Sequence, residues 1–292
     1  MRSLWKNHVD LLRWLMIALL FISLPAFSWD ATGHRVIAAI AYSQLTPEVK
    51  RRVDHLTAFN DKGYPSLSRF LYLAVEPDKW RQSDGGESAS WHYLDTPWRI
   101  DATPVITVTT PNLLSSLQEN VNILSSDQAS AAQKARSLAY VLHLVGDAHQ
   151  PLHCINRISR QFPQGDRGGN LFPIQDNRVT NLHAFWDEGA IWLVPLSQRY
   201  PLSNKNVLRL ARQLQKHYPV AVFAEKAQDK TLSDWTAQCY AIAKEKVYQL
   251  APNTKPSAQY RVQAAAIVAE QLTLAGYRLG NLLNSLLVKD SQ

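Results

Sequence analysis

The sequence predicts a mainly helical, all-α protein that forms one domain, and three observations support this fold class. Apolar residues recur at three- to four-residue spacing through most of the chain. Strand signals are few, and no Ser/Gly-rich linker or internal repeat interrupts the pattern. The composition is that of a folded protein, because 46% of the 292 residues are hydrophobic and 19% are charged, with a net charge of +7. These values exclude a disordered chain, a collagen and a coiled coil.

The first 28 residues have the pattern of a signal peptide. Basic residues flank the start of an apolar run from Trp14 to Leu24, which is shorter than the ~20 residues that span a bilayer. Pro25 ends that run, and the small residues before Trp29 predict cleavage after Ser28. We expect residues 1–28 to be removed and residues 29–292 to be exported, to a periplasm or out of the cell, without stable membrane association. An uncleaved membrane anchor is the alternative.

Helical periodicity then accounts for most of the mature chain. Thr46 before Pro47 and Ser233 before an apolar run fit the chemistry of helix starts. Helices are expected over residues 33–45, 47–56, 112–124, 130–148, 182–193, 206–217, 233–250 and 257–287.

Two regions lack helical periodicity. The best strand signal flanks Asp176 and Asn177, where residues 170–175 and 178–181 predict one small β-hairpin. Between Asn60 and Pro111, the Pro, Gly and Ser content predicts long irregular connections. Such loops often carry functional sites.

Paired His and Asp residues are the most informative pattern. His143 and Asp147 are four residues apart on one predicted helix, and His183 and Asp187 repeat that spacing on another. Between the pairs, Pro151 is expected to end the helix and turn His153 back toward them. With 2 cysteines in the chain, a metal site has to use nitrogen and oxygen ligands, which suit zinc. Exposed ion pairs are the alternative, but the first pair lies in an apolar stretch, where an unpaired polar group is costly.

The chain resembles a known family, the zinc-dependent single-strand-specific nucleases typified by the fungal S-one and P-one enzymes, whose fold is shared with bacterial zinc phospholipase C. Six collinear motifs carry the resemblance, and together they are far more specific than any one of them. They are Trp29–His34, Pro77–Arg81, Trp91–Asp95, His143–His153, Gly168–Asn170 and Asn181–Asp187. The resemblance implies a phospholipase C/nuclease-type single domain that holds three zinc ions.

The resemblance also implies which residues bind each ion. One zinc takes Asp78, His92, His143 and Asp147. The second takes the α-amino nitrogen and carbonyl oxygen of Trp29, together with His34 and again Asp147. The third takes His153, His183 and Asp187. Because an amine binds metal only when it is free, the second set depends on the predicted cleavage after Ser28.

By the same resemblance, the chain is an exported endonuclease for single-stranded RNA and DNA that leaves 5′-phosphate ends and also acts on 3′-nucleotides. Arg81 matches the residue that contacts the scissile phosphate, and Asp95 matches the carboxylate that orients the attacking water. Tyr93 offers a ring for base stacking, and Gly169 and Asn170 a loop that approaches the base edge. Without the motifs, Arg81 would suit a surface salt bridge, Asp95 a loop cap and Tyr93 a core aromatic. A monomer is expected.

Cys154 and Cys239 are the remaining candidates for chemistry. In an oxidising compartment they can form a disulfide. Two buried thiols are the alternative, which the resemblance does not settle.

Two other functions compete with the nuclease. A zinc-dependent phospholipase C of the same fold typically has Glu where this chain has Asp187, and it lacks the Gly-Gly-Asn loop. A non-catalytic zinc-binding export protein has no need of Arg81 or Asp95. The nuclease is therefore the favoured interpretation.

Overall fold

The computed structural model describes residues 29–60, 63–106, 111–193, 203–223 and 231–288. The predicted signal peptide, residues 1–28, lies outside the described residues. No helix in the described ranges is long and apolar enough to cross a membrane.

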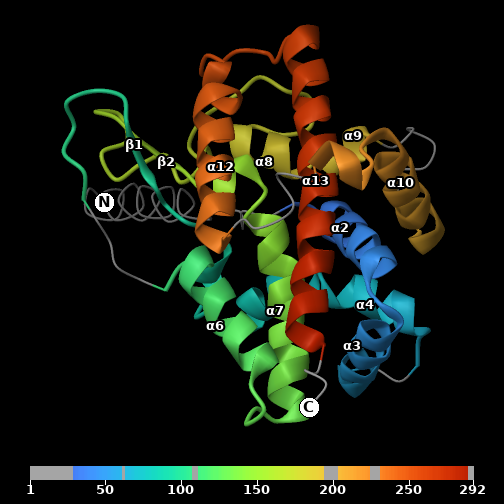
Figure 1. Cartoon of the computed structure of the whole chain (residues 1–292). Coiled ribbons are helices and arrows are strands. Elements are labelled where there is room, and N and C mark those ends of the chain that lie inside the picture. Colours follow the sequence, from blue (N-terminus) through green and yellow to red (C-terminus); the bar gives the residue numbers. More distant parts are fainter. Residues whose placement is uncertain (1–28, 61–62, 107–110, 194–202, 224–230, 289–292) are drawn as a thin grey trace, which may run out of the picture.

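Helices make up most of the described chain (Figure 1). The α-helices are α2 (Ala31–Gln44), α3 (Pro47–Asn60), α4 (Ser66–Leu73), α5 (Glu76–Ser83), α6 (Leu113–Ser125), α7 (Ala131–Asp147), α8 (Leu182–Asp187), α9 (Gly189–Trp192), α10 (Asn204–His217), α12 (Leu232–Glu245) and α13 (Ala258–Leu287). Four short 3₁₀ helices are η1 (Ala89–His92), η2 (Pro151–His153), η4 (Val220–Phe223) and η5 (Val247–Gln249). The mainly helical fold class is confirmed.

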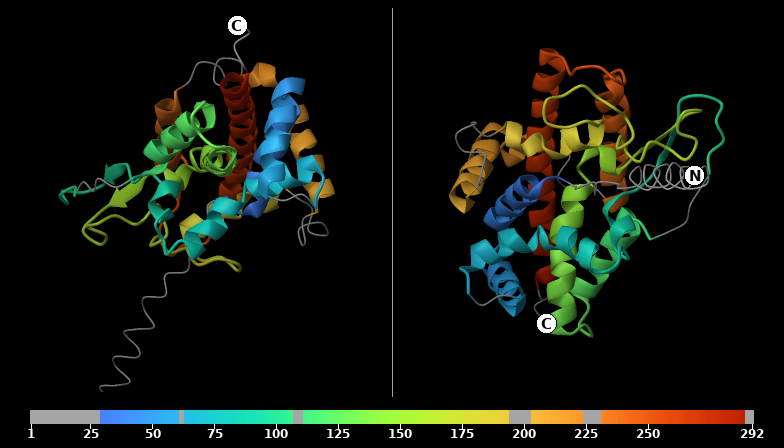
Figure 2. Two further views of the ribbon diagram at one scale, coloured as in Figure 1. Left: turned by 90° about the horizontal axis from the view of Figure 1, so that it is seen from below. Right: turned by 180° about the vertical axis from the view of Figure 1, so that it is seen from behind.

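The long helix α13 runs through most of the height of the molecule (Figure 1) and packs against α2. Small residues allow this contact, because a Cβ atom added at Gly276 would lie 2.5 Å from the Cβ atom of Ile40. Seen from behind, α2, α3 and α4 lie on one side of α7 and α6 lies on the other (Figure 2). Helix α7 is thus enclosed, and its residues from Ser137 to Asp147 are all buried.

Most of the expected helices form, although their ends are shifted. Two helices, α4 and α5, form where the sequence predicted none. The segment expected at 182–193 is two short helices, α8 and α9, and the segment expected at 233–250 ends as an α-helix at Glu245. Helix α12 also starts earlier than expected, because Thr231 and not Ser233 caps it, through a reciprocal capping box with Asp234. Residues 60–111 were expected to be irregular, but they include α4 and α5, which are short helices of eight residues each.

The predicted β-hairpin around Asp176 and Asn177 was wrong. The described residues there contain one isolated antiparallel bridge, between Pro173 and Asn181, and no strands. Pro173 lacks an N–H group, which limits the ladder. The two named strands are instead β1 (Pro97–Arg99) and β2 (Asn156–Ile158), which pair in parallel with Trp98 opposite Arg157. Residues 97–106 and 156–165 form an arm that projects beside the helices (Figure 1).

A disulfide joins Cys154 to Cys239 across 85 residues of sequence. It fastens the end of η2 to the middle of α12, and both cysteines are buried. Of the two alternatives left open by the sequence, the structure has the disulfide.

We expect removal of this bond to be costly. Substituting Cys239→Ser should lower the free energy of unfolding by about 4 kcal/mol, because a loop of this length loses much of its freedom when it is closed in the unfolded chain. Urea denaturation of both proteins, with and without reductant, measures the effect. Reductant should lower the midpoint of the wild-type protein and leave that of the variant unchanged. Equal midpoints under oxidising conditions would contradict the prediction.

Candidate metal centre

The centre is built around the C-terminal turns of α7. Ser130 caps the start of this helix through a capping box with Gln133, and its period then puts His143 and Asp147 on one face, one turn apart. Both side chains are fully buried. Gly146 lets α2 approach closely, because a Cβ atom there would lie 2.7 Å from His34 Nδ1. His34 reaches this place from the first turn of α2, which Asp30 caps by accepting hydrogen bonds from Thr32 N and Gly33 N.

Three groups of His and Asp side chains converge there, each with ligand atoms close enough to hold one metal ion. The groups are His34, His143 and Asp147; Asp78, His92 and His143; and His153, His183 and Asp187. These eight residues are all of the side chains that the family resemblance implied as ligands. They come from α2, α5, η1, α7, η2 and α8, so segments far apart in the sequence meet at one place.

The carboxylate of Asp147 lies at the junction of the first two groups. Its Oδ1 atom is 3.5 Å from His34 Nε2, whereas its Oδ2 atom is 3.2 Å from His92 Nδ1 and 3.4 Å from His143 Nε2. The two oxygens therefore face different histidines. This arrangement allows one carboxylate to bridge two ions.

The third group adjoins that carboxylate, because His153 Nδ1 is 3.9 Å from Asp147 Oδ1. His183 Nε2 is 3.3 Å from Asp187 Oδ2, and His153 Nε2 is 3.9 Å from Asp187 Oδ1. Gln150 donates from Nε2 to Asp187 Oδ1 at 2.6 Å, which fixes the orientation of this carboxylate. Such outer partners hold metal ligands in place.

Backbone carbonyls fix the orientation of three histidines. Nδ1 of His143 lies 2.9 Å from Ala74 O, Nδ1 of His153 lies 2.6 Å from His92 O, and Nδ1 of His183 lies 2.7 Å from Gly168 O. Since a carbonyl only accepts, each Nδ1 carries the proton and each Nε2 presents a lone pair to the centre. His92 differs, because its Nδ1 atom faces the centre.

Burial favours the neutral form of the histidines and of two carboxyl groups in this centre. The neutral form is the metal-binding form of a histidine but not of a carboxyl group. It lowers the pKa of His34, His92 and His153 well below the usual value, and neighbouring histidines add to the effect. The imidazoles are thus neutral, which is the ligand form. Burial raises the pKa of Asp147 and Asp187 well above the usual value, and the charge of Asp78 acts in the same direction. A cation among these carboxylates would counter both effects.

The donor set fits zinc. Two ligand atoms on one tetrahedral zinc, each bonded at about 2.0–2.1 Å, lie about 3.3 Å apart. In the second group, His143 Nε2 is 3.0 Å from His92 Nδ1 and 3.6 Å from Asp78 Oδ1. In the third group, the buried Nε2 atoms of His153 and His183 form no hydrogen bond with any described residue. Lone pairs that converge in this way are what a metal ion requires.

Trp29 adjoins the same centre. Its side chain is buried and its indole Nε1 donates to Gly146 O at 3.0 Å, next to Asp147. The following residue, Asp30, donates from its backbone N to Asp187 O at 3.0 Å. The main chain of Trp29 is therefore held between α7 and α8.

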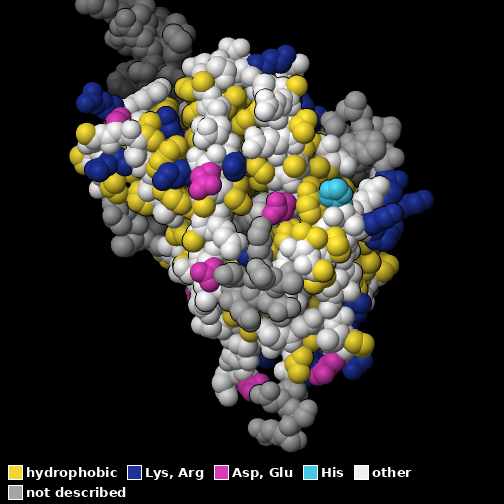
Figure 3. Space-filling view, turned by 45° about the horizontal axis from the view of Figure 1, so that its top comes forward, with side chains coloured by type: hydrophobic (Ala, Val, Ile, Leu, Met, Phe, Trp, Pro, Cys, Tyr) yellow, Lys and Arg dark blue, Asp and Glu magenta, His cyan; other side chains and the backbone are white. Residues whose placement is uncertain are grey.

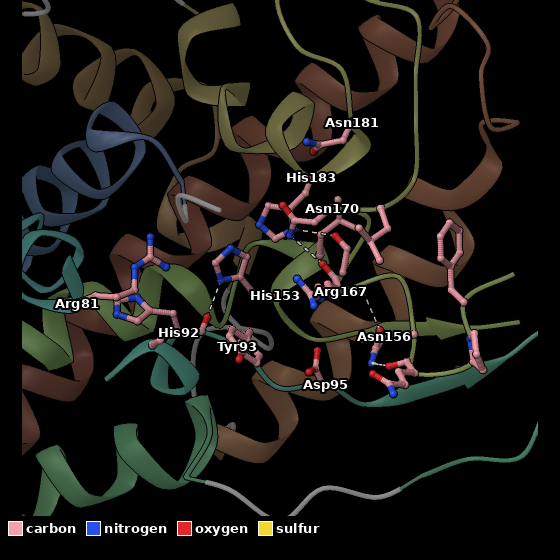
Figure 4. Close-up of a pocket in the computed structure, with 18 of the residues that line it drawn as sticks. Arg81, His92, Tyr93, Asp95, His153, Asn156, Arg167, Asn170, Asn181 and His183 are labelled. Carbon is pink, nitrogen blue, oxygen red and sulfur yellow. Dashed lines mark hydrogen bonds between the residues drawn. The ribbon is translucent and has the colours of Figure 1, made fainter. Parts of the chain in front are cut away.

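A pocket of about 950 Å³ opens beside the metal centre (Figure 4). His92, His153 and His183 form part of its wall, and most of the residues predicted to act on substrate line it as well. These are Arg81, Tyr93, Asp95 and Asn170. Gly169 differs from that prediction: it is buried behind Gly168 and Asn170, and its carbonyl accepts from His183 N.

Two local structures position the predicted catalytic side chains. Helix α5 places Arg81 one turn after Asp78, with Arg81 Nη2 3.4 Å from Asp78 Oδ1 and only 12% of the Arg81 side chain exposed. The pairing of β1 with β2 and the bond from Leu94 N to His153 O at 2.7 Å place Asp95 at the pocket. Desolvation raises the pKa of Asp95 to about 6, and the charge of Asp166 adds to this effect. Tyr93 is 40% exposed and so is not a core aromatic.

Sequence reasoning missed two residues here, Gln150 and Arg167. Gln150 lies inside the His-Gln-Pro-Leu-His motif, which was the available signal, and it donates the hydrogen bond that orients Asp187. For His149 the sequence favours a hydrogen bond that supports a metal ligand, but its ring faces Val145 O and Arg278 instead. Burial, together with the charge of Arg278, lowers the pKa of His149 to about 3. Arg167 also lines the pocket. No periodicity or spacing marked it.

Comparison with known proteins identifies the family of this chain. The sequence pattern of the family described as S1/P1 Nuclease matches residues 29–288. The chain belongs to the S1/P1 nuclease family. Among its relatives in that family, Nuclease S1 of Aspergillus oryzae is 26% identical over 177 residues, which cover 58% of this chain and 57% of the relative.

Other relatives extend the comparison. Nuclease P1 of Penicillium citrinum is 26% identical over 172 residues, covering 54% of this chain and 57% of the relative. Endonuclease 4 of Arabidopsis thaliana is 24% identical over 288 residues, covering 89% of each chain. This chain thus spans little more than half of the two fungal relatives and most of the plant relative.

Proposed function

We propose that this S1/P1 family member is an exported zinc-dependent phosphodiesterase that cleaves single-stranded RNA and DNA, leaves 5′-phosphate ends and removes the phosphate of 3′-nucleotides. The observation that carries the proposal is the meeting of three His/Asp groups at the wall of a pocket that also contains Arg81 and Asp95. The names of the fungal and plant relatives support a nuclease.

The three groups would hold three zinc ions. Asp78, His92, His143 and Asp147 would hold one, and His153, His183 and Asp187 another. The main chain of Trp29 would join His34 and Asp147 around the remaining one. Zinc bound there would supply Lewis acidity, which makes water a better nucleophile near neutral pH and stabilises negative charge on phosphoryl oxygens.

Two side chains of the pocket then act on the substrate. Arg81 binds the oxygens of the scissile phosphate, because a guanidinium matches the geometry of a phosphate and is always charged. Asp95 orients the attacking water and accepts its proton, which requires the ionised carboxylate. Its pKa of about 6 keeps it ionised at neutral pH.

The rest of the pocket favours unpaired bases. The exposed ring of Tyr93 offers a stacking surface, and Asn170 offers an amide to a base edge. Basic side chains gather over the arm and over α10 (Figure 3), where Lys205, Arg212 and Lys216 are exposed. A positive surface attracts a polyanion and raises its encounter rate.

Export and metal binding are coupled in this proposal. Cleavage after Ser28 would free the α-amine of Trp29, and the buried position of that residue beside Gly146 supports a ligand role. A precursor that retains residues 1–28 would then bind fewer ions. The zinc content and the N-terminal residue of the mature protein, measured together, test both statements: three ions and an N-terminal Trp29 are expected.

Incubation with defined substrates tests the activity. The mature protein is given single-stranded DNA, single-stranded RNA, a 3′-nucleotide and phosphatidylcholine, each with and without chelator. We expect cleavage of the first three, 5′-phosphate ends by mass spectrometry, and loss of activity with chelator. Hydrolysis of phosphatidylcholine alone would overturn the proposal in favour of a phospholipase C, and zinc binding without any hydrolysis in favour of a zinc-binding protein.

Arg81→Ala should lower kcat/KM for single-stranded DNA by about 10²- to 10³-fold, because it removes a fixed positive charge from the reacting phosphate. Arg81→Lys should recover part of this loss. The matched control is Lys79→Ala, which removes an exposed positive charge from the same helix. Zinc content should be unchanged in all three variants. Equal rates for Arg81→Ala and the control would contradict the role of Arg81.

A further inference from the structure

The pocket contains a second guanidinium that the proposed roles leave unused. Arg167 is exposed, lines the pocket, and forms no ion pair with any residue in the described part of the chain. Figure 4 shows it on the side of His153 and His183 opposite Arg81, close to Asp95. The two arginines therefore flank the metal centre from opposite sides.

The two arginines also act on different sets of titratable groups. The charge of Arg81 acts on the buried ligands, including His92, His153 and Asp187. The charge of Arg167 acts on Tyr93 and Asp95. Arg81 also acts on Tyr93, so the two arginines share that residue, and Arg167 lines the pocket wall together with Tyr93 and Asp95.

The loop that carries Arg167 is held rigidly. Asn156 accepts from Arg167 N at 3.0 Å, and Asn170 donates to Arg167 O at 2.8 Å. The neighbouring Asp166 is fully buried and accepts from Gly169 N at 3.1 Å and from the hydroxyl of Tyr248 at 2.8 Å. The loop is therefore ordered before any substrate arrives, and less freedom is lost on binding.

The backbone of Arg167 has a left-handed conformation, which suits glycine better than arginine. Its φ angle is +55°, in the left-handed region, and it stands next to Gly168 at +58°. An arginine there costs about 1 kcal/mol, whereas a glycine costs nothing. The side chain, and not the backbone, accounts for an arginine at this position.

We propose that Arg167 binds a second phosphate of the substrate, adjacent to the scissile one, and thereby favours oligonucleotides over mononucleotides. This inference rests on the proposed function, because it assumes that the scissile phosphate lies between Arg81 and the metal centre. A guanidinium that forms no ion pair with a described carboxylate, although its charge acts on Asp95, is suited to this contact. A 3′-mononucleotide has no second phosphate and gains nothing from Arg167.

Substrates that differ by one phosphate test the inference. A dinucleoside monophosphate contains only the scissile phosphate, and its 5′- and 3′-phosphorylated forms each contain a second one. Arg167→Ala should lower kcat/KM by about 10- to 100-fold for at least one phosphorylated form. The unphosphorylated form should change by no more than about twofold. Arg167→Gly should behave in the same way, which separates loss of the side chain from any effect on the loop.

Arg160→Ala is the matched control, because Arg160 is an exposed arginine of the adjacent arm that does not line the pocket. It should leave all three rates unchanged. Equal losses on the phosphorylated and unphosphorylated substrates would overturn the inference, since they would indicate an effect through Asp95.

A binding measurement separates this inference from the proposed function. Fluorescence anisotropy of the zinc-loaded protein with a single-stranded phosphorothioate oligonucleotide, chosen to resist cleavage, gives the affinity at several salt concentrations without turnover. Arg167→Ala should reduce the slope of log K against log salt concentration by about 0.7, the value for one phosphate contact on a single strand. An unchanged slope would contradict the inference. A wild-type protein that cleaves no nucleotide yet shows the reduced slope in the variant would overturn only the proposed function.

Discussion

Asp147→Asn is expected to remove almost all hydrolytic activity while leaving the fold intact. Asp147 presents one oxygen to His34 and the other to His92 and His143, so its loss weakens two of the three candidate metal groups at once. Outer partners of metal ligands are already worth about 10- to 100-fold. For a ligand shared by two ions, we expect a fall of at least about 10³-fold in kcat/KM for single-stranded DNA, and the loss of more than one zinc per chain.

Stability without metal distinguishes this result from simple misfolding. Burial raises the pKa of Asp147 and disfavours its charged form, so an isosteric amide should be tolerated. The metal-free variant should unfold at a temperature no lower than the metal-free wild type, and added zinc should raise that temperature much less than it does for the wild type. The control is Asp127→Asn, because Asp127 is an exposed acid between α6 and α7. Retention of the full zinc content by Asp147→Asn would contradict the prediction.

Asp95→Asn should lower kcat by about 10²- to 10⁴-fold, the usual contribution of a positioned acid or base. The pH profile gives the more specific test. Because the carboxylate must be ionised to accept a proton and its pKa is raised to about 6, wild-type activity should fall about tenfold per pH unit below that value. The residual activity of Asp95→Asn should not show this fall.

Asp101→Asn provides a matched control for the pH profile. Asp101 is a partly exposed acid on the arm, and hydrogen bonds from Thr103 and Arg160 lower its pKa to about 2. Its charge is therefore constant across the range measured, and its variant should keep the wild-type profile. If Asp95→Asn retains the fall below pH 6, that fall belongs to another group and the assigned role of Asp95 is wrong.

Much of the metal centre was predictable because helical spacing alone places His143 beside Asp147 and His183 beside Asp187. The proline in His149–His153 also correctly predicted that His153 returns to the same place. Helix α5 was missed, although Pro77 and two acidic residues in its first turn are start signals, because eight residues are too few to show a clear period. The order of the motifs, and not local pattern, identified Asp78 and Arg81.

Other features depend on contacts that no local pattern encodes. The parallel pairing of β1 with β2 joins segments more than fifty residues apart, so its three-residue strands carry no turn signal. His143 Nδ1 bonds to Ala74 O because that carbonyl lies at the end of α4, where it has no partner within the helix. The left-handed backbone of Arg167 likewise follows from the bonds of Asn156 and Asn170, which the fold brings to it.

The acceptors that orient His143, His153 and His183 are main-chain oxygens, those of Ala74, His92 and Gly168. Mutation cannot delete a main-chain oxygen, although it can move one. Side chains along the pocket wall can therefore be exchanged, and substrate preference altered, without re-aiming the imidazoles. In this architecture the aim of the imidazoles and the lining of the pocket can therefore change independently of each other.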